Sequence, residues 1–397
     1  MLTLEMILDA KKALEGIARK TPLDPAPKLG ENVYIKAENL QLTGAFKLRG
    51  AYNKIRSLTP EEAARGVIAC SAGNHAQGVA LSSTKLGVKS IICMPAGAPI
   101  SKVEATKGYG AEVVLVPGVY DDAAKEAERL AKEKGYTFAH PFDDPYVIAG
   151  QGTIGVEILE QLPDASQVVV PIGGGGLISG IAMAIKMLNP SCKVIGVQAA
   201  GAASMYTSVQ RGERLELSKV ATIADGIAVK KPGELTFELC KKYVDEIVTV
   251  SEDEIASAIL FLLETQKTVA EGAGATPVAA VMSGRVDITQ GKTVCVVSGG
   301  NVDVTTLSRV ITKGLSNSGR IVEISTKIVD KPGSLIQLLQ AVSSTGANVV
   351  NIHHAREDRQ SVVGECMVTM VLETIDQAHI HQIEASLKTN GYHLVKR

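Results

Sequence analysis

In Thr43-Gly44-Ala45-Phe46-Lys47-Leu48-Arg49-Gly50-Ala51, a lysine stands between an aromatic and an apolar residue near the start of a chain of 397 residues. A buried lysine has a lowered pKa, and a neutral amine forms a Schiff base with an aldehyde. Composition alone favours a solvated surface lysine. Two glycine-rich turns, 173–176 and 298–301, reverse that preference because they suit a phosphorylated aldehyde attached to Lys47.

A glycine tetrad follows the apolar run 167–172 and precedes Leu177 and an apolar helical stretch; its members are Gly173, Gly174, Gly175 and Gly176. Bare backbone N–H groups at a helix N-terminus favour an anion such as phosphate. Ile181 stands where a P-loop requires lysine, and Ile178 stands at the third glycine of the dinucleotide pattern. The tetrad therefore predicts a site for a phosphomonoester, with a purely structural turn as the alternative.

A second strand-to-helix turn lies in Cys70-Ser71-Ala72-Gly73-Asn74-His75-Ala76-Gln77-Gly78. The same anion logic makes it a candidate for a substrate carboxylate, held by the amides of 71–75 and the Ser71 hydroxyl. The Asn74 side chain could donate to a phenolate oxygen. An ordinary helix N-cap at Ser71 or Asn74 is the alternative.

Up to about residue 313, short β-rich apolar runs alternate with helical stretches, which is typical of an α/β fold with mostly parallel sheets. Ligands bind such sheets at the carboxyl ends of the strands. We therefore expect a catalytic region over 1–313, built from two α/β subdomains, the smaller one roughly at 46–149.

The pattern changes after a polar, small-residue stretch at 314–319, which we interpret as a linker. Beyond it, alternating apolar positions predict strands over 322–328, 348–353, 362–372 and 392–395, and helical periodicity predicts helices after Ser334 and around Ile383. The order βαββαβ predicts a ferredoxin-like α+β domain over 320–397.

Many separated motifs, in order, resemble the fold-type II pyridoxal-phosphate enzymes, and most closely their threonine/serine dehydratase branch. They span about 5–313 and comprise T-G-A-F-K-L-R-G, S-A-G-N-H-A-Q-G, G-Q-G-T at 150–153, the tetrad, A-D-G at 224–226, V-A-E-G-A-G-A at 269–275 and S-G-G-N at 298–301. Residues 320–397, with Asp330-Lys331-Pro332-Gly333-Ser334-Leu335 in the first turn, resemble an ACT domain, an amino-acid-sensing module.

The resemblance implies specific roles at the cofactor. Lys47 holds pyridoxal 5'-phosphate as a Schiff base, and Asn74 bonds the ring hydroxyl. Ser298 faces the pyridine nitrogen as a neutral partner, so the ring is a weaker electron sink than in transaminases. Glu271 orients Lys47 or a cation, or else caps a helix. The remaining expected cofactor contacts are Phe46, the tetrad, Leu177, Gly226 and Gly299.

The implied reaction is β-elimination of water from L-threonine, giving 2-oxobutanoate and ammonia, and from L-serine, giving pyruvate, with Lys47 as the base. The alternatives are a β-replacement synthase, a serine racemase and a catalytically idle amino-acid sensor. Racemases of this fold carry a serine hydroxyl in place of Ala72, and a methyl group cannot return a proton.

The C-terminal region is expected to bind a regulatory amino acid, with isoleucine or valine as the first candidates. The predicted contacts are Asp330, Pro332, Gly333, Ser334 and Leu335 at the turn, with Asn348 or Asn351 from the following strand. A module that only extends an oligomer interface is the alternative. We expect a homo-oligomer, either a dimer or a tetramer.

Composition excludes several partners. With 45% hydrophobic residues, 21% charged residues and a formal net charge of -1, the chain has no electrostatic footprint for nucleic acid or an anionic membrane. The N-terminus lacks a signal peptide, so a cytoplasmic location is expected. The six cysteines suggest reduced core thiols, and the pairs His353-His354 and His379-x-His381 lack partners at useful spacing, so no metal site is predicted.

Overall fold

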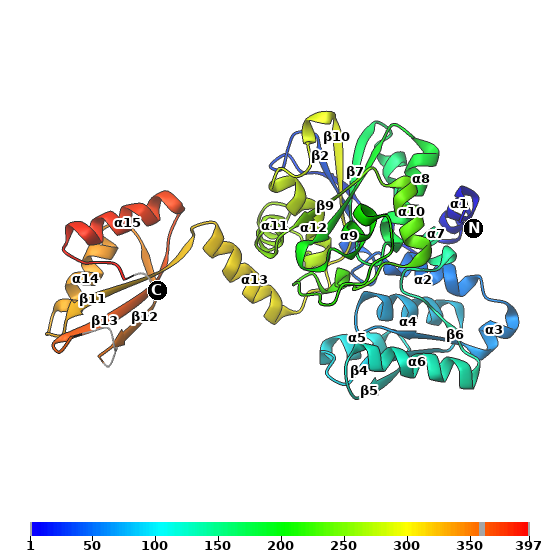
Figure 1. Ribbon diagram of the computed structural model, residues 1–397, viewed down its shortest axis with the longest axis horizontal. Coiled ribbons are helices and arrows are strands. Elements are labelled where there is room, and N and C mark those ends of the chain that lie inside the picture. The colour runs from blue at the N-terminus through cyan, green and yellow to red at the C-terminus, as the bar shows by residue number, and fades with distance from the viewer. Residues whose placement is uncertain (1, 357–361, 396–397) are drawn as a thin grey trace. The chain divides into compact units, whose positions relative to one another are not determined.

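The computed structural model describes residues 2–356 and 362–395. The chain divides into two compact units, Met1–Asp303 and Val304–Arg397, which are described separately (Figure 1). The contact boundary lies before the helix α13 (Val304–Asn317). Residues 314–317, expected to be part of a linker, are instead the last residues of α13, and Gly319 ends the segment with a φ of +70°.

A six-stranded sheet forms the larger part of the first unit. Its order is β1 (Leu23–Pro25), β2 (Val33–Ala37), β10 (Lys292–Val297), β7 (Ala165–Pro171), β8 (Lys193–Ala199) and β9 (Glu246–Val250). All pairs are parallel except β1 with β2. Most residues of β7, β8 and β10 are buried, as expected for parallel strands covered on both faces.

A second, four-stranded parallel sheet has the order β5 (Glu112–Val116), β4 (Ser90–Pro95), β3 (Val67–Cys70) and β6 (Thr137–Phe138). These strands lie within 46–149, the range expected for the smaller subdomain. The predicted α/β class with mostly parallel sheets is confirmed by both sheets.

The helices of this unit begin and end at sequence signals. Asp144 caps α7 through the amides of Tyr146 and Val147, and Ser251 forms a capping box with Glu254 at α11. The helices are α1 (Leu4–Ala13), α2 (Lys47–Arg56), α3 (Pro60–Arg65), α4 (Asn74–Leu86), α5 (Ile100–Gly108), α6 (Tyr120–Lys134), α7 (Pro145–Gln161), α8 (Gly176–Leu188), α9 (Ser204–Arg211), α10 (Glu234–Tyr243), α11 (Glu252–Thr265) and α12 (Gly272–Met282).

The second unit contains a small antiparallel sheet with the strand order β11-β13-β12. Its elements after α13 are β11 (Ile321–Val329), α14 (Ser334–Ser343), β12 (Asn348–Ala355), β13 (Glu365–Glu373) and α15 (Gln377–Thr389). The strand predicted over 392–395 is reduced to one bridge, between Leu394 and Thr326 on the free edge of β11. This connectivity agrees with the predicted ferredoxin-like order.

Among the described residues, none of the helices combines the length and the apolar character that crossing a membrane would require.

Candidate active site

The predicted site residues follow the carboxyl ends of three strands. Ser298 comes directly after β10, Gly173 comes just after the neighbouring strand β7, and Ser71 comes directly after β3 of the smaller sheet. Ligands bind parallel sheets at such ends. The glycine tetrad and Ser298 therefore follow the ends of two strands that are adjacent in one sheet.

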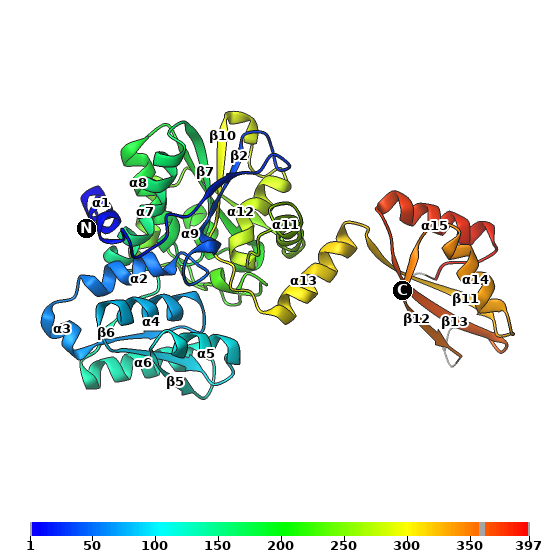
Figure 2. The same cartoon turned by 180° about the vertical axis from the view of Figure 1, so that it is seen from behind.

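The segment that carries Lys47 is attached to the turn after β10. Ala45 forms a bridge with Gly299, and the Phe46 amide donates to the Ser298 carbonyl at 3.1 Å. Lys47 is the first residue of α2, which packs against α4 and α7 and lies between the two sheets in both views (Figures 1 and 2).

The Lys47 side chain is partly buried. Its Nζ donates to the Pro141 carbonyl at 2.6 Å and lies 5.3 Å from the centroid of the Phe46 ring. Burial lowers the pKa of Lys47 to about 8, although the nearby Glu271 carboxylate opposes the shift. About a tenth of this amine is therefore neutral at pH 7, and the neutral form can act as a nucleophile or a base.

Two residues after Lys47, Arg49 anchors α2 through buried ion pairs. Its guanidinium donates to Glu38 at 2.8 Å and 2.9 Å and to Glu157 on α7 at 2.6 Å and 3.0 Å. Lys36 on β2 completes the network, 2.6 Å from the second oxygen of Glu157. This network joins α2 to the larger sheet, so the backbone of Lys47 is held in a defined position.

The glycine tetrad forms a cradle that leaves no room for side chains. A Cβ on Gly174 would lie 2.5 Å from the Phe142 ring, and one on Gly176 would lie 2.8 Å from the Phe142 carbonyl. Gly175 has a φ of +98°, which favours glycine. Because α8 begins at Gly176 without a side-chain cap, its first amides remain available to an anion. Leu177 follows within the buried core.

The start of α4 offers a second set of free amides. The Ser71 hydroxyl accepts from the Gly73 amide at 3.1 Å, and no side chain caps the helix at Gly73. Ala72 is partly buried beside this turn. The His75 side chain is buried, bonds the Ala139 carbonyl through Nε2 at 2.8 Å and has its pKa lowered by burial to about 3. Neutral His75 therefore offers a carboxylate its backbone amide and no positive charge.

Glu271 lies beside the turn after β10 and the start of α4. The Asn74 amide donates to its two oxygens at 2.8 Å and 3.1 Å, and Asn301 donates to Asn74 Oδ1 at 2.9 Å. Burial raises the pKa of Glu271 to about 7, and the Asn74 hydrogen bond acts in the opposite direction. Gly226 and Gly299 flank the carboxylate, since a Cβ on either would lie within 3.3 Å of Oε1.

Glu271 occupies the N-cap position of α12, yet its side chain makes no capping hydrogen bond. The capping alternative is therefore wrong for this conformation, because both carboxylate oxygens are engaged by Asn74 instead.

The sequence interpretation missed four residues of this site. Pro141 and Phe142 lie between Lys47 and the tetrad, and His140 accepts from the Phe142 and Asp143 amides through Nδ1. Asn301 ties Asn74 to the Thr43 carbonyl, to which it donates at 2.6 Å. The run His140-Pro141-Phe142 precedes an N-cap aspartate and a helix, which is the only signal that marked it.

The predicted regulatory residues separate into two groups. Asp330, Pro332, Gly333 and Leu335 line a cavity of about 390 Å³, and Ser334 is the first residue of α14 beside it. Asn348 and Asn351 pair with Glu373 and Val371 of β13. Those two residues of β13 pair in turn with the start of β11, whereas the turn at Asp330 follows the end of β11. Within one chain, these asparagines therefore do not reach the turn, because β12 runs with its other end toward it.

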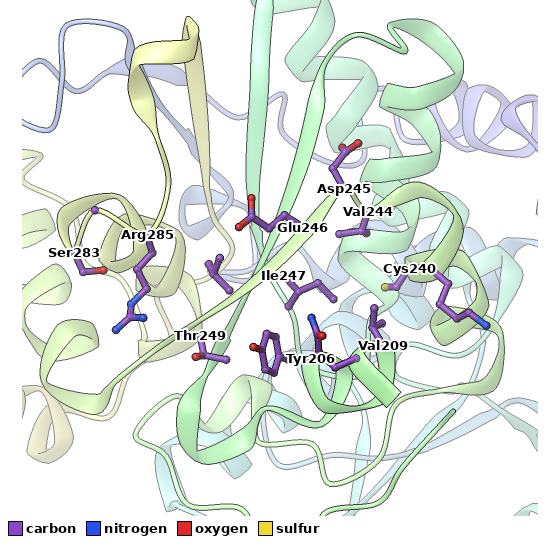
Figure 3. Close-up of a pocket in the computed structure, with 14 residues that line it drawn as sticks. Tyr206, Val209, Cys240, Val244, Asp245, Glu246, Ile247, Thr249, Ser283 and Arg285 are labelled. Carbon is purple, nitrogen blue, oxygen red and sulfur yellow. The ribbon is translucent and has the colours of Figure 1, made fainter. Parts of the chain in front are cut away.

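A hollow of about 760 Å³ lies elsewhere on the first unit, among α9, α10 and β9 (Figure 3). Tyr206, Cys240 and Arg285 are among its lining residues, and none of the predicted cofactor or substrate contacts lines it. Charged side chains from the ends of α10 and β9 line it as well, which indicates a solvated surface depression.

Comparison with known proteins shows the family of this chain. The family model described as "Pyridoxal-phosphate dependent enzyme" matches residues 14–300. The chain belongs to this family. It is 52% identical to the L-threonine ammonia-lyase of Thermotoga maritima, over 99% of this chain and 98% of that protein. It is 49% identical to the "L-threonine dehydratase catabolic TdcB" of Staphylococcus aureus strain N315, over 80% of this chain and 94% of that protein.

Among solved structures, the processed form of threonine deaminase isoform 2 from Solanum lycopersicum superposes with a TM-score of 0.74 at 41% identity. That match covers 78% of this chain and 93% of the tomato chain.

The residues present fit the cofactor of this pyridoxal-phosphate-dependent family. A half-buried lysine with a lowered pKa suits an aldehyde, and the glycine cradle with free amides suits its phosphate. Ser298, 2% exposed, supplies a hydroxyl at the end of β10. The residue that directly follows β10 is this serine and not a carboxylate.

Proposed function

We propose that this enzyme is a carbon–nitrogen lyase that removes water and ammonia from L-threonine to give 2-oxobutanoate, and converts L-serine to pyruvate in the same way. One observation carries the proposal: an amine whose pKa is about 8 lies in the same site as a phosphate cradle and a helix start with free amides. The names of the relatives from T. maritima and S. aureus support threonine as the substrate.

Pyridoxal phosphate, when bound, supplies an electron-withdrawing ring that stabilises negative charge at the substrate α-carbon. Lys47, neutral above its pKa, takes the α-proton at Nζ. The amides at the start of α4 hold the substrate carboxylate, with the Ser71 hydroxyl beside them. The α-proton taken up at Lys47 and the departing β-hydroxyl together account for the water that is lost, and an enamine remains. After release, water hydrolyses the enamine to the 2-oxo acid and ammonia.

Ser298 favours elimination over competing reactions. A hydroxyl at the ring nitrogen leaves the ring a weaker electron sink than a carboxylate would, so charge leaves promptly with the β-substituent. Ala72 supplies no acid on the opposite face of the substrate, which disfavours return of the α-proton as in a racemase.

The test is product analysis with L-threonine and L-serine. We expect ammonia and the 2-oxo acid in equal amounts. D-serine as the main product from L-serine would identify a racemase, and a thioether formed with an added thiol would identify a β-replacement synthase. A chain that takes up no cofactor and forms no product would be an idle sensor.

We also propose that an amino acid, with isoleucine or valine as first candidates, regulates this activity by binding at the cavity around Asp330 and Gly333. The cavity of about 390 Å³ is large enough for a small amino acid, and the uncapped start of α14 offers amides to a carboxylate. Allosteric coupling of about 1 to 3 kcal/mol would change the substrate affinity roughly 5- to 150-fold.

Calorimetry on the full chain should detect isoleucine or valine binding outside the active site. A chain that ends at Asn317 should retain threonine turnover and lose the response. The S. aureus relative supports this expectation, because 80% of this chain is enough to match 94% of that protein. Asn348→Ala and Asn351→Ala variants test whether a second copy completes the site in a homo-oligomer. Absence of any binding would remove the sensing role.

A further inference from the structure

Three metal-ligating side chains from separate segments meet at one end of the small sheet. Asp330 directly follows β11, His354 lies near the end of β12, and Cys366 lies at the start of β13. The strand register brings these side chains together, because Cys366 pairs with Ile328 and His354 pairs with Val368. Since paired residues share a face of the sheet, and residues 366 and 368 share one too, His354 and Cys366 lie on the same face.

The ligand atoms of these three residues lie within 4.8 Å of one another. His354 Nε2 is 2.8 Å from Cys366 Sγ, and the second atom contacted by Sγ is the Ile328 carbonyl at 3.6 Å. Zinc bonds of about 2.0–2.3 Å place neighbouring tetrahedral ligands about 3.5 Å apart. The cluster is therefore compact enough for one ion after a small opening of the His354–Cys366 contact.

The chemistry of the donors selects the class of metal. A thiolate with an imidazole and a carboxylate suits zinc and similar borderline-soft divalent ions, whereas magnesium and calcium prefer oxygen donors. The two anions balance a divalent charge. Arg356 donates from Nε to Asp330 Oδ2 at 2.9 Å and would hold that carboxylate as an outer partner.

The cluster opens onto the cavity of about 390 Å³, which Asp330, His354, Arg356 and Cys366 all line. Three protein ligands beside open space leave one coordination position accessible. Asp330 and His354 are exposed, so an ion can reach the site without opening the core.

We propose that Asp330, His354 and Cys366 form a binding site for a zinc-class divalent cation, with its remaining coordination position facing the cavity. This site is independent of the proposed lyase reaction, since its three residues belong to the second unit. It also does not require an amino-acid effector.

Cobalt titration of the metal-free, reduced full-length holoenzyme tests the site. Tetrahedral cobalt absorbs in the red region of the visible spectrum, which the cofactor leaves clear. We expect one Co²⁺ per chain, displaced by Zn²⁺. Cys366→Ser, His354→Gln and Asp330→Asn should each weaken binding at least about tenfold.

His353→Gln is the matched control, because this exposed histidine is adjacent to His354 but points to the opposite face of β12. It should bind cobalt as the wild type does. His354→Gln changes an exposed residue and so keeps the test valid even if Cys366→Ser, in the core, fails to fold. Absence of the cobalt absorption in the wild type, or its persistence in His354→Gln, would overturn the proposal.

Discussion

The Asn74 amide donates to both carboxylate oxygens of Glu271, at 2.8 Å and 3.1 Å. This contact joins the start of α4 to the start of α12. The carboxylate, whose pKa burial raises to about 7, is in turn one of the charges that act on Lys47. The titrations of Glu271 and Lys47 are therefore coupled, and Asn74 is a hydrogen-bond donor to one member of the pair.

The first prediction concerns the pH dependence of cofactor capture. Only the neutral Lys47 amine reacts, so the capture rate of the cofactor-free enzyme should rise with pH through about 8. Ionised Glu271 raises the pKa of that amine. Glu271→Gln should therefore move the rise to lower pH, by about one unit. Absorbance-monitored mixing with pyridoxal phosphate measures it.

Glu254→Gln, which alters a carboxylate of α11 paired with Arg285, serves as the control and should leave the profile in place. An unchanged profile in Glu271→Gln would show that its carboxylate does not influence the Lys47 amine.

Lys47→Ala should lose the visible absorption band of bound cofactor and reduce threonine turnover by at least about 10² to 10⁴-fold, because the variant lacks both nucleophile and base. The fold should persist, since Arg49 still anchors α2. Lys54→Ala, on the same helix and paired with Asp144, is the matched control. Comparable turnover in both variants would refute the assignment of Lys47.

Gly174→Ala should weaken cofactor binding. Its Cβ would meet the Phe142 ring at 2.5 Å, and overpacking of this kind costs about 1–3 kcal/mol, which corresponds to a roughly 5- to 150-fold loss of affinity. Equilibrium titration of the cofactor-free enzyme gives the affinity. Gly108→Ala, where a Cβ meets nothing within 4 Å, should bind as the wild type does; equal losses in both would contradict the cradle.

The buried ion-pair network should dominate stability near α2. Glu157→Gln leaves Lys36 and Arg49 sharing one carboxylate, so we expect a loss of about 3–5 kcal/mol in the free energy of unfolding. Glu160→Gln, which breaks partly exposed pairs one turn away, should cost less than about 1 kcal/mol. Urea unfolding followed by circular dichroism compares them, and similar costs would show that the network is not a structural anchor.

Sequence patterns were sufficient to predict the parts of the site that short, contiguous stretches of sequence mark. The tetrad, Ser298 and the strands that precede them could be predicted because glycines and apolar runs mark strand-to-helix turns. Pro141 and Phe142 could not, since their importance comes from contacts with Lys47 and Gly174 that only the packed fold creates.

Strand register accounts for further differences. The partners of His354, Asp330 and Cys366, are distant in sequence and reach it only through the pairing of three strands. The same register carries Asn348 and Asn351 away from the turn at Asp330. Such placements depend on which residues pair across a sheet. The alternation of apolar residues predicts which face of the sheet a side chain lies on, but it does not identify the residue that pairs with it.

The position of β10 sets when the larger sheet can be completed during synthesis. This strand lies between β2 and β7, although it is made last of the three. Until residues 292–301 emerge from the ribosome, the edges of β2 and β7 lack their partner and Thr43 lacks Asn301, which is 258 residues away. Insertion of β10 is thus a late, non-local and slow folding step, and the nascent enzyme exposes unpaired strand edges until then.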